Sequence, residues 1–494
     1  IYTYFIMKKI SCNVLCNEIF DNLPVPDRYF LCYTKNRNPG YQERMIMEKN
    51  LTSGSVLKNI VFFSLPYLLS YFLQTLYGMA DLFIVGQFNG VDSITAVSVG
   101  SQVMHMLTVM IVGLAMGSTV VIGKAVGAQK KDQAAEAIGN TIVLFMAVAA
   151  VLTLGLMLFV DPIVRVMSTP EEAVSGTVAY LKICFMGIPF ITAYNIISSV
   201  FRGMGDSKSP MYFIAVACGV NIVLDYVFIG GFHLGPAGAA LGTVLSQTVS
   251  VIVSMAVIRK RKTGIRIRRD NFLPKGNVMR QILKVGIPVA LQDGFIQIAF
   301  IVITVIVNQR GLNDAAAVGI VEKLIGIVFL VPSSMLSAVS ALSAQNIGAG
   351  KPERAVKTLK YAVCITVGFG FVVSVLTQFI SVQAVGFFTE DAEVAILGGQ
   401  YLRSYIWDCM LAGVHFCFSG YFCALGMAGI SFLHNSVSIV CVRIPGAWLA
   451  SRLFPDTLYP MGLASPAGSL LSGIICIAAF LYLQKNRKGR ESGA

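Results

Sequence analysis

Four oxygen-bearing side chains stand inside segments that are otherwise apolar. They are Asp81 in the first such segment, Asn221 and Asp225 in the fifth, and Thr243 in the sixth. Because Asn221 and Asp225 are four residues apart, a helix would place both side chains on one face. A carboxyl group inside a membrane span costs about 2.5 to 3.5 kcal/mol, so it needs a partner, a proton or a water-lined cavity.

These side chains suit a small cation. Counted at about 1.5 Å per residue along each helix, Asp81, Asp225 and Thr243 fall at a similar depth. Two carboxylates, an amide and a hydroxyl are hard oxygen ligands for a monovalent cation such as Na⁺, and two adjacent acids could share a proton instead. The alternative is that they only tie helices together by hydrogen bonds. We favour the cation site, because a neutral amide would join helices without the cost of a carboxylate.

The later part of the chain has charges of its own inside apolar segments: Asp293, Glu322, Lys323, Asp408 and Arg443. In the seventh segment, Asp293 and Gln297 begin a polar stripe at roughly helical spacing. Such a stripe could line a central cavity and meet a cationic substrate. A salt bridge to Lys323 or Arg443 is the competing interpretation, and the sequence leaves both open.

The elements that must position these residues are membrane helices. The chain is 55% hydrophobic and only 13% charged, and its mean hydropathy is +0.72, which leaves too little polar surface for a soluble globule of this length. A span needs about 20 mostly apolar residues. We predict an all-α membrane protein with twelve spans, near 59–86, 93–118, 137–160, 175–200, 209–232, 236–258, 282–308, 314–345, 354–380, 394–424, 428–451 and 462–484.

The twelve spans divide into two halves that repeat at an offset near 221 residues. Paired positions carry the repeat: Ala96-Val97 with Ala317-Val318, Gly127-Ala128 with Gly348-Ala349, Tyr180-Leu181 with Tyr401-Leu402, and Gly205 with Gly426. Each half has an even number of spans, so a pseudo-two-fold axis along the membrane normal should relate them. We predict six-helix bundles at 51–258 and 282–484, a solvated basic linker at 259–281 and a tail at 485–494. Residues 1–50 show no helical period, and we expect a disordered or non-native extension.

Basic residues indicate the orientation in the membrane. They gather in every second loop and in both tails, as at Lys130, Lys131, Arg202, Lys208, the run Arg259 to Arg269, Lys351 and Arg354. The opposite loops carry more acids, so the positive-inside rule places both termini in the cytoplasm. The net charge of +13 is therefore explained by topology, and we expect no nucleic-acid partner.

Several chemistries lack their motifs. Gly348-Ala349-Gly350-Lys351-Pro352 is not a P-loop, because proline breaks it. Most of the eleven cysteines lie in apolar spans, and neither they nor the four scattered histidines show metal-site spacing. We predict no enzyme activity and no cofactor, so energy must come from an ion gradient. A prenyl transferase would need paired Asp-rich motifs, and a major facilitator would carry Gly-x-x-x-Asp-Arg after its second span; both are absent.

Over residues 51–484 the chain resembles the multidrug and toxic compound extrusion (MATE) family. The resemblance rests on Leu65-Pro66 with Gln74, Tyr77 and the run Asp81 to Gly86, on Gly127-Ala128-Gln129-Lys130, on Phe201 to Ser207, on Asn221 to Asp225, and on Gly238 to Thr243. It implies that Asp81, Asn221, Asp225 and Thr243 form the family's cation site, with Ala239 as a carbonyl ligand and Gln74 and Tyr77 in support. The stretch Phe295-Ile296-Gln297 lacks the glutamate of the NorM branch, so the chain looks closer to the DinF-like branch.

The resemblance implies a bacterial inner-membrane antiporter that exchanges inward H⁺ or Na⁺ for outward organic cations by alternating access. We expect a monomer surrounded by membrane lipids. Pro66 could let the first helix bend, and Asn195, Asp293 and Gln297 are expected to line the substrate cavity. The alternative on the same scaffold is a flippase for a lipid-linked precursor, which would need more basic residues in that cavity than Lys323 and Arg443 provide.

Overall fold

The computed structural model describes residues 51–260 and 265–491, and within these ranges every regular element is helical. The expectation for residues 1–50 lies outside the described residues. Ser55 begins the first helix as its N-cap, where its hydroxyl accepts a hydrogen bond from the backbone N–H of Lys58.

The first six predicted spans are present as helices with turns at their ends. They are α3 (Val56–Phe88), α4 (Val91–Gly127), α5 (Lys131–Leu158) with the short α6 (Val160–Val166), α7 (Glu171–Gly203), α8 (Lys208–Asp225) continued by the π-helix η1 (Tyr226–Gly231), and α9 (Gly235–Lys260). The turns after α4 and α7 contain the left-handed residues Gln129 and Gly205. Both turns therefore reverse the chain over only a few residues.

The second six spans are more broken. After η2 (Arg269–Phe272) come α10 (Gly276–Asn308), α11 (Leu312–Val328) with α12 (Leu330–Gly348), α13 (Pro352–Gly386), α14 (Ala392–Tyr405) with α15 (Trp407–Leu425), α16 (Ala428–Ser438) with the π-helix η3 (Ile439–Arg443) and α17 (Ile444–Leu453), and α18 (Tyr459–Gly462) with α19 (Ala464–Glu491). Among the described residues, eleven helices are long and apolar enough to cross a membrane. The remaining span, the eleventh in order and predicted at 428–451, is divided by η3.

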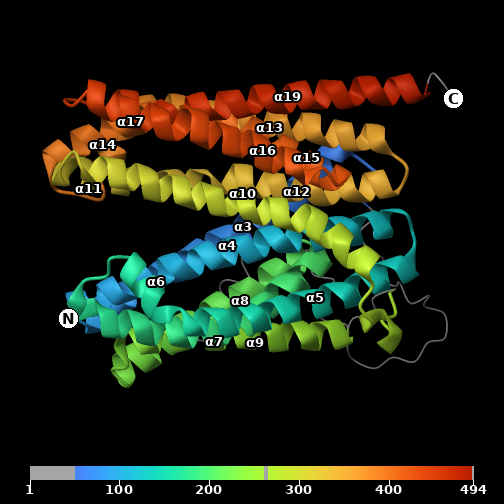
Figure 1. Ribbon diagram of the computed structural model, residues 1–494, viewed down its shortest axis with the longest axis horizontal. Coiled ribbons are helices and arrows are strands. Elements are labelled where there is room, and N and C mark those ends of the chain that lie inside the picture. Colours follow the sequence, from blue (N-terminus) through green and yellow to red (C-terminus); the bar gives the residue numbers. More distant parts are fainter. Residues whose placement is uncertain (1–50, 261–264, 492–494) are drawn as a thin grey trace, which may run out of the picture. The chain divides into compact units, whose positions relative to one another are not determined.

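The two halves repeat the same packing. In the first half α4 packs on α7, α7 on α9 and α3 on α8, and in the second half the equivalent pairs are α12 with α15, α15 with α19 and α10 with α16. Figure 1 shows α10 to α19, in yellow to red, on one side of the helices α5 to α9 in green. Each half has an apolar cluster of its own, and the first part of α3 packs among α12, α13, α15 and α19 of the second half.

The halves meet most closely at the end where α4 and α12 finish and α10 begins, which we call the linker end. A Cβ on Gly127 would collide with the carbonyl oxygen of Gln345, and a Cβ on Gly348 would collide with that of Lys124. These two contacts are equivalent under the repeat offset. We call this contact between the halves the seam. Because only glycine leaves room for another backbone at such positions, both sides of the seam need glycine.

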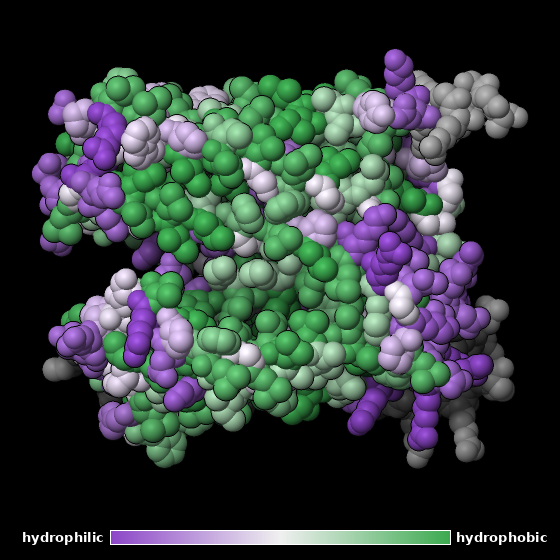
Figure 2. Space-filling view, in the orientation of Figure 1, coloured by the Kyte–Doolittle hydropathy of each residue, from purple (hydrophilic) through white to green (hydrophobic). Residues whose placement is uncertain are grey.

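The contact between the halves continues to the middle of the helices. Along α4 and α10 it runs from Gly117 beside the carbonyl of Ile282 to Gly294, where a Cβ would lie 3.6 Å from the sulfur of Met110. At the other end of the helices the surface is hollowed between the halves, at the left of Figure 2. We call this the open end and the hollow the cleft.

Apolar side chains form the surface between the two ends. Figure 2 shows a belt of hydrophobic residues in green, with hydrophilic residues in purple at both ends. Exposed members of this belt include Leu154 and Leu158 of α5 and Phe371 and Phe379 of α13. Such exposure is costly in water and favourable in hydrocarbon, which agrees with the predicted membrane environment.

The described part of the linker is mostly exposed, at residues 266–270 and 272–277, and it is attached to α5 at a few points. The side-chain amide of Asn140 on α5 donates to the carbonyl of Asn271 and its oxygen accepts from the backbone N–H of Lys275. Lys275 also forms an ion pair of 2.9 Å with Glu136. Helix α10 starts at Gly276, before the predicted position 282.

Candidate cation site

Asp81 is buried near the open end of α3, where only 3% of its surface is exposed. The hydroxyl of Thr243 on α9 donates a hydrogen bond of 3.2 Å to its Oδ2. Asn221 and Asp225 lie close enough to its carboxyl group for electrostatic interaction. The structure thus brings together Asp81, Asp225 and Thr243, which the sequence places at similar depth, and Asn221, which the sequence places on one helical face with Asp225.

Asn221 and Asp225 lie at the end of α8 and are fully buried. The amide nitrogen of Asn221 donates to Oδ1 of Asp225 over 3.5 Å. Directly after Asp225 the helix widens into η1. π-helical turns of this kind are common at functional sites, because the extra residue re-aims neighbouring side chains.

Gly242 on α9 makes space for the second acid. A Cβ at this position would collide with Oδ1 of Asp225 and lie 3.6 Å from the amide nitrogen of Asn221. Since Thr243 is the next residue, one turn of α9 supplies both the space for Asp225 and the hydroxyl for Asp81.

Three acceptor oxygens in this group have no hydrogen-bond partner in the described part of the chain: Asp81 Oδ1, Asn221 Oδ1 and Asp225 Oδ2. A buried acceptor without a donor costs about 1 to 3 kcal/mol. Three of them on and beside two carboxyl groups form a cluster of hard oxygen atoms, which suits H⁺ or Na⁺. Within the described residues no group of three or more His, Cys, Asp or Glu side chains could hold a metal ion, so a zinc-type site is absent there.

Further side chains enclose Asp81. The partly buried Tyr77 and the buried Tyr180 and Cys184 lie close enough for electrostatic interaction with its carboxyl group. Sequence reasoning included Tyr77 and missed the other two, although Tyr180 belongs to the repeated pair Tyr180-Leu181. Ala239 is fully buried on α9, one turn before Thr243, in the apolar cluster that contains Ile84.

Other predicted site residues lie elsewhere. Pro66 precedes Asp81 by fifteen residues, about 22 Å along a helix, and α3 runs through it unbroken. Gln74 is partly exposed on α3, about two turns from Asp81. Asn195 on α7 lines a small cavity with Tyr67, Thr119 and Arg202, where the Arg202 guanidinium lies 4.3 Å from the centre of the Tyr67 ring.

Asp293 and Gln297 lie on α10 in the other half. The Asp293 carboxyl group faces Gly113 of α4, where a Cβ would lie 2.8 Å from its Oδ2. It is partly exposed and has no hydrogen bond or ion pair within the described ranges. Asp293 directly precedes Gly294, which lies against Met110 of α4, so its carboxyl group stands at the contact between the two halves.

The sequence left open whether these polar residues form salt bridges, and the structure gives a partner for one of them. Arg443 pairs with Asp408, at 3.4 Å between Nη2 and Oδ2, and not with Asp293. Lys323 is exposed.

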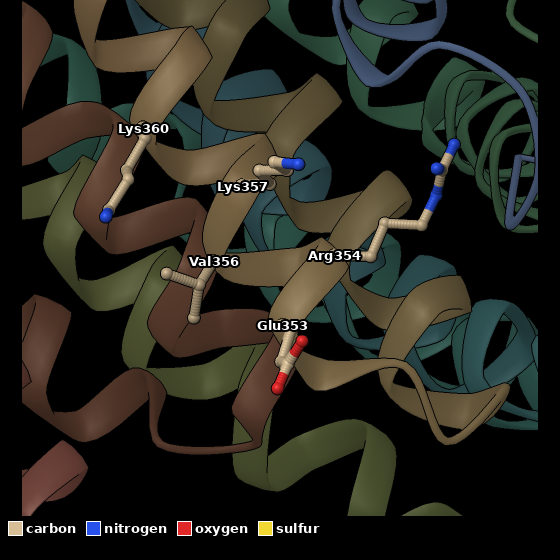
Figure 3. A pocket seen from close by; sticks show the side chains of 5 residues that line it. All are labelled: Glu353, Arg354, Val356, Lys357 and Lys360. Atoms are coloured by element: carbon tan, nitrogen blue, oxygen red, sulfur yellow. The ribbon is translucent and has the colours of Figure 1, made fainter.

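A surface pocket of about 310 Å³ lies at the linker end of α13. Figure 3 shows its lining residues Glu353, Arg354, Val356, Lys357 and Lys360, all from the first turns of this helix. Three of the five are basic, so a cation would be repelled. This pocket is separate from the acids of the first half.

Comparison with known proteins gives the family. The MatE family profile matches residues 66–227 and 288–449, one match in each half. Among relatives, the chain is 27% identical over 455 residues to the probable multidrug resistance protein YoeA of Bacillus subtilis, covering 90% of this chain and 98% of that one. It is 26% identical over 437 residues to the multidrug export protein MepA of Staphylococcus aureus, covering 87% and 95%.

Solved structures confirm the fold class, an all-α membrane protein with twelve spans in two six-helix bundles. An outward-facing multidrug resistance MATE family transporter of the MOP superfamily superimposes with a TM-score of 0.84 at 23% identity, covering 90% of this chain and 99% of that one. A MATE structure in complex with MaL6 gives 0.82 at 23% identity, with the same coverage. The profile covers well over half of the sequence and the motifs agree with it, so the chain belongs to the MatE family of multidrug and toxic compound extrusion transporters.

Proposed function

We propose that this chain exports organic compounds, often cationic ones, in exchange for H⁺ or Na⁺ moving inward. One observation carries the proposal: the buried group around Asp81 and Asp225, with three acceptor oxygens that lack donors. The names of YoeA and MepA support multidrug compounds as the cargo.

The energetics are sufficient. A hundredfold concentration gradient of a neutral substrate costs about 2.7 kcal/mol. One cation crossing about 100 mV supplies about 2.3 kcal/mol, and a pH difference of one unit adds about 1.4 kcal/mol. A single coupling ion is therefore enough for substantial export.

Alternating access uses the two ends of the seam between the halves. In the present arrangement the halves are closed at the linker end by Gly127 and Gly348 and separated at the open end. A cation neutralises the carboxylates of the first half, and a substrate occupies the cleft. If each ligand binds one arrangement of the halves more tightly, each shifts the population toward that arrangement.

Asp293 is the substrate contact of the cleft in this proposal. It offers a carboxylate without a hydrogen-bond or ion-pair partner among the described residues, at the contact between α10 and α4 that we take to border the cleft. Gln297 follows one turn later on the same helix. Desolvated contact with a carboxylate favours organic cations over anions. A lipid-linked phosphate would meet this negative charge, and Arg443 is already paired with Asp408, so the flippase alternative is not favoured.

The proposed location is the bacterial cytoplasmic membrane, with the linker end and both termini in the cytoplasm. The loops of the linker end carry Lys130, Lys131 and Lys351, as the positive-inside rule requires. The cleft then opens outward. The protein is proposed to act as a monomer, since each chain contains both halves of the path.

Efflux of a fluorescent organic cation tests the function. In everted vesicles, accumulation of the dye should follow an imposed pH gradient or an imposed Na⁺ gradient, each applied alone, and the effective gradient identifies the coupling ion. Asp81→Asn should insert normally but lose gradient-driven accumulation. Glu172→Gln, at an exposed position on α7, is the matched control and should behave as wild type. Full accumulation by Asp81→Asn would overturn the proposal.

A further inference from the structure

The second half contains a buried charged group of its own. Asp408 on α15 is fully buried and Arg443, the last residue of η3, is 8% exposed. Nη2 of Arg443 lies 3.4 Å from Oδ2 of Asp408 and donates a hydrogen bond of 2.7 Å to the hydroxyl of Ser469 on α19. Three helices of this half thus meet at one guanidinium.

This group is built like the cation site of the first half. There, Asp225 stands at the start of a π-helix and faces Gly242, and the next residue, Thr243, contributes a hydroxyl. Here, Arg443 stands at the end of a π-helix and faces Gly468. A Cβ on Gly468 would lie 3.0 Å from Nε of Arg443.

The parallel extends to the hydroxyl. Ser469 follows Gly468 just as Thr243 follows Gly242, and each hydroxyl bonds to the charged group of its own half. Both halves therefore use a π-helix on one span and a glycine followed by a hydroxyl residue on the next span to seat an ionisable side chain.

The two groups differ in charge. In the first half, the side chains that interact with the Asp81 carboxyl group are Asp225, Asn221 and Thr243, so two carboxylates lie close together without a positive side chain among these neighbours. In the second half, the carboxylate of Asp408 faces the guanidinium of Arg443. Since a buried charge must be compensated, the first group requires a cation from solution and the second does not.

We propose that Arg443 is a tethered cation, which takes in the second half the place that the exchangeable cation takes in the first. The second half then binds no exchangeable cation, and the first half alone sets the number of coupling ions per cycle. Removing the guanidinium creates a new cation site at Asp408. The coupling part of this inference rests on the proposed function, whereas the number of cations bound does not.

Other titratable groups surround the pair and must be kept constant in a test. Tyr401 and Tyr405 approach it from α14, and Glu322 on α11 interacts with these two tyrosines. His415 on α15 shares the hydroxyl of Ser469 at 3.2 Å, and His434 on α16 lies beside His415, at 5.5 Å between ring centres. None of them is substituted in the variants below. Because Arg443 also interacts with His415 and His434, a gain in bound cations is assigned to Asp408 only where Asp408→Asn removes it.

Counting cations in the purified full chain tests the wild-type second half without altering it. Proton uptake by potentiometric titration and radioactive Na⁺ by equilibrium dialysis are compared between wild type and the double variant Asp81→Asn/Asp225→Asn. The double variant should lose all Na⁺ binding, and its proton uptake should fall by no more than the two removed carboxyl groups account for. Na⁺ still bound by the double variant would overturn the inference.

A second set of variants tests the guanidinium itself. Arg443→Met should gain one bound cation per chain, as H⁺ or Na⁺, relative to wild type. Arg443→Lys, which keeps the charge, should show no gain, and Arg443→Met/Asp408→Asn should lose the gain. A folded Arg443→Met protein without the extra cation would contradict the proposal. If Arg443→Met does not fold, the counting experiment on the first half decides.

Transport separates this inference from the proposed function. In proteoliposomes, the slope of the logarithm of substrate accumulation against the logarithm of the ion gradient gives the number of coupling ions per substrate. In Arg443→Met this number should increase by one. A wild type that shows no ion-driven export would refute the proposed function and leave the binding counts valid. Ion-driven export by wild type with an unchanged slope in Arg443→Met would refute the inference alone.

Discussion

The hydroxyl of Thr243 and the carboxylate of Asp81 join two helices that are far apart in the chain, over 3.2 Å and 162 residues. This bond fixes one oxygen of Asp81 and leaves the other, Oδ1, without a donor. The same helix turn gives Asp225 its space through Gly242. The first and sixth spans are therefore coupled through the acids that we assign to the cation.

Removing the Thr243 hydroxyl should weaken cation binding. Thr243→Val keeps the side-chain shape but loses the hydrogen bond to the Asp81 carboxylate, and a hydrogen bond to a charged group is worth about 1.5 kcal/mol or more. We expect the coupling ion to be needed at about tenfold higher concentration for half-maximal export. Thr248→Val removes a hydroxyl that bonds only to the backbone of Val244 on the same helix, and it should leave this concentration unchanged. Equal behaviour of the two variants would contradict the role of Thr243.

A methyl group at Gly242 should displace Asp225. Because the Cβ would collide with Oδ1 of that residue, Gly242→Ala should abolish ion-driven export while the protein still inserts. Gly219→Ala on α8 is the matched control, since a Cβ there meets nothing within 4 Å and alanine stabilises a helix by about 0.5 to 1 kcal/mol over glycine. Dye accumulation and expression level measure both variants.

Asp293→Asn should distinguish between substrates by their charge. Loss of a charged contact worth about 1.5 kcal/mol should raise the KM for an organic cation by about tenfold and leave the KM for a neutral compound within about twofold. The measurement is initial export rate against concentration for one cationic and one neutral fluorescent substrate. A similar change in KM for both compounds would remove Asp293 from substrate binding.

Widening the seam at the linker end should change which end of the protein is open. Gly127→Ala and Gly348→Ala each place a methyl group against a carbonyl of the other half, so the closed linker end should become less populated. Cys423, which is buried on α15 near this end, should then react faster with a membrane-impermeant maleimide in everted vesicles.

Two controls belong to the labelling experiment. Cys423→Ser must remove the increase, and Gly368→Ala, at an open position on α13, must not produce it. An unchanged labelling rate in both seam variants would mean that the glycines do not hold the closed end.

The cation group could be predicted from the sequence because its signal is local. A carboxylate in an apolar run is conspicuous, and the spacing of Asn221 and Asp225 gives their common face. Counting residues along three spans was then enough to place Asp81, Asp225 and Thr243 at one height. The role of these residues in binding a cation stays a prediction until ions are counted.

Other features have no local signal. Gly242 looks like any small residue of a membrane helix, and its purpose appears only when Asp225 is seen against it. The partner of Arg443 depends on how α15 and η3 pack, so spacing could not choose between Asp408 and Asp293. The breaks at Phe329 and Ile406 and the two π-helices fall inside continuous apolar runs, where periodicity is uninformative.

The reciprocal seam at Gly127 and Gly348 also bears on ancestry. Gly127 contacts the carbonyl of Gln345, and Gly348 contacts the carbonyl of Lys124. Both the two glycines and the two carbonyl residues are related by the repeat offset. That is the pattern of an isologous dimer interface, in which one patch contacts its own copy. A polypeptide of half this length could have built the same junction by pairing with itself, and gene duplication followed by fusion would then have freed one copy to keep its acids and the other to acquire a resident arginine.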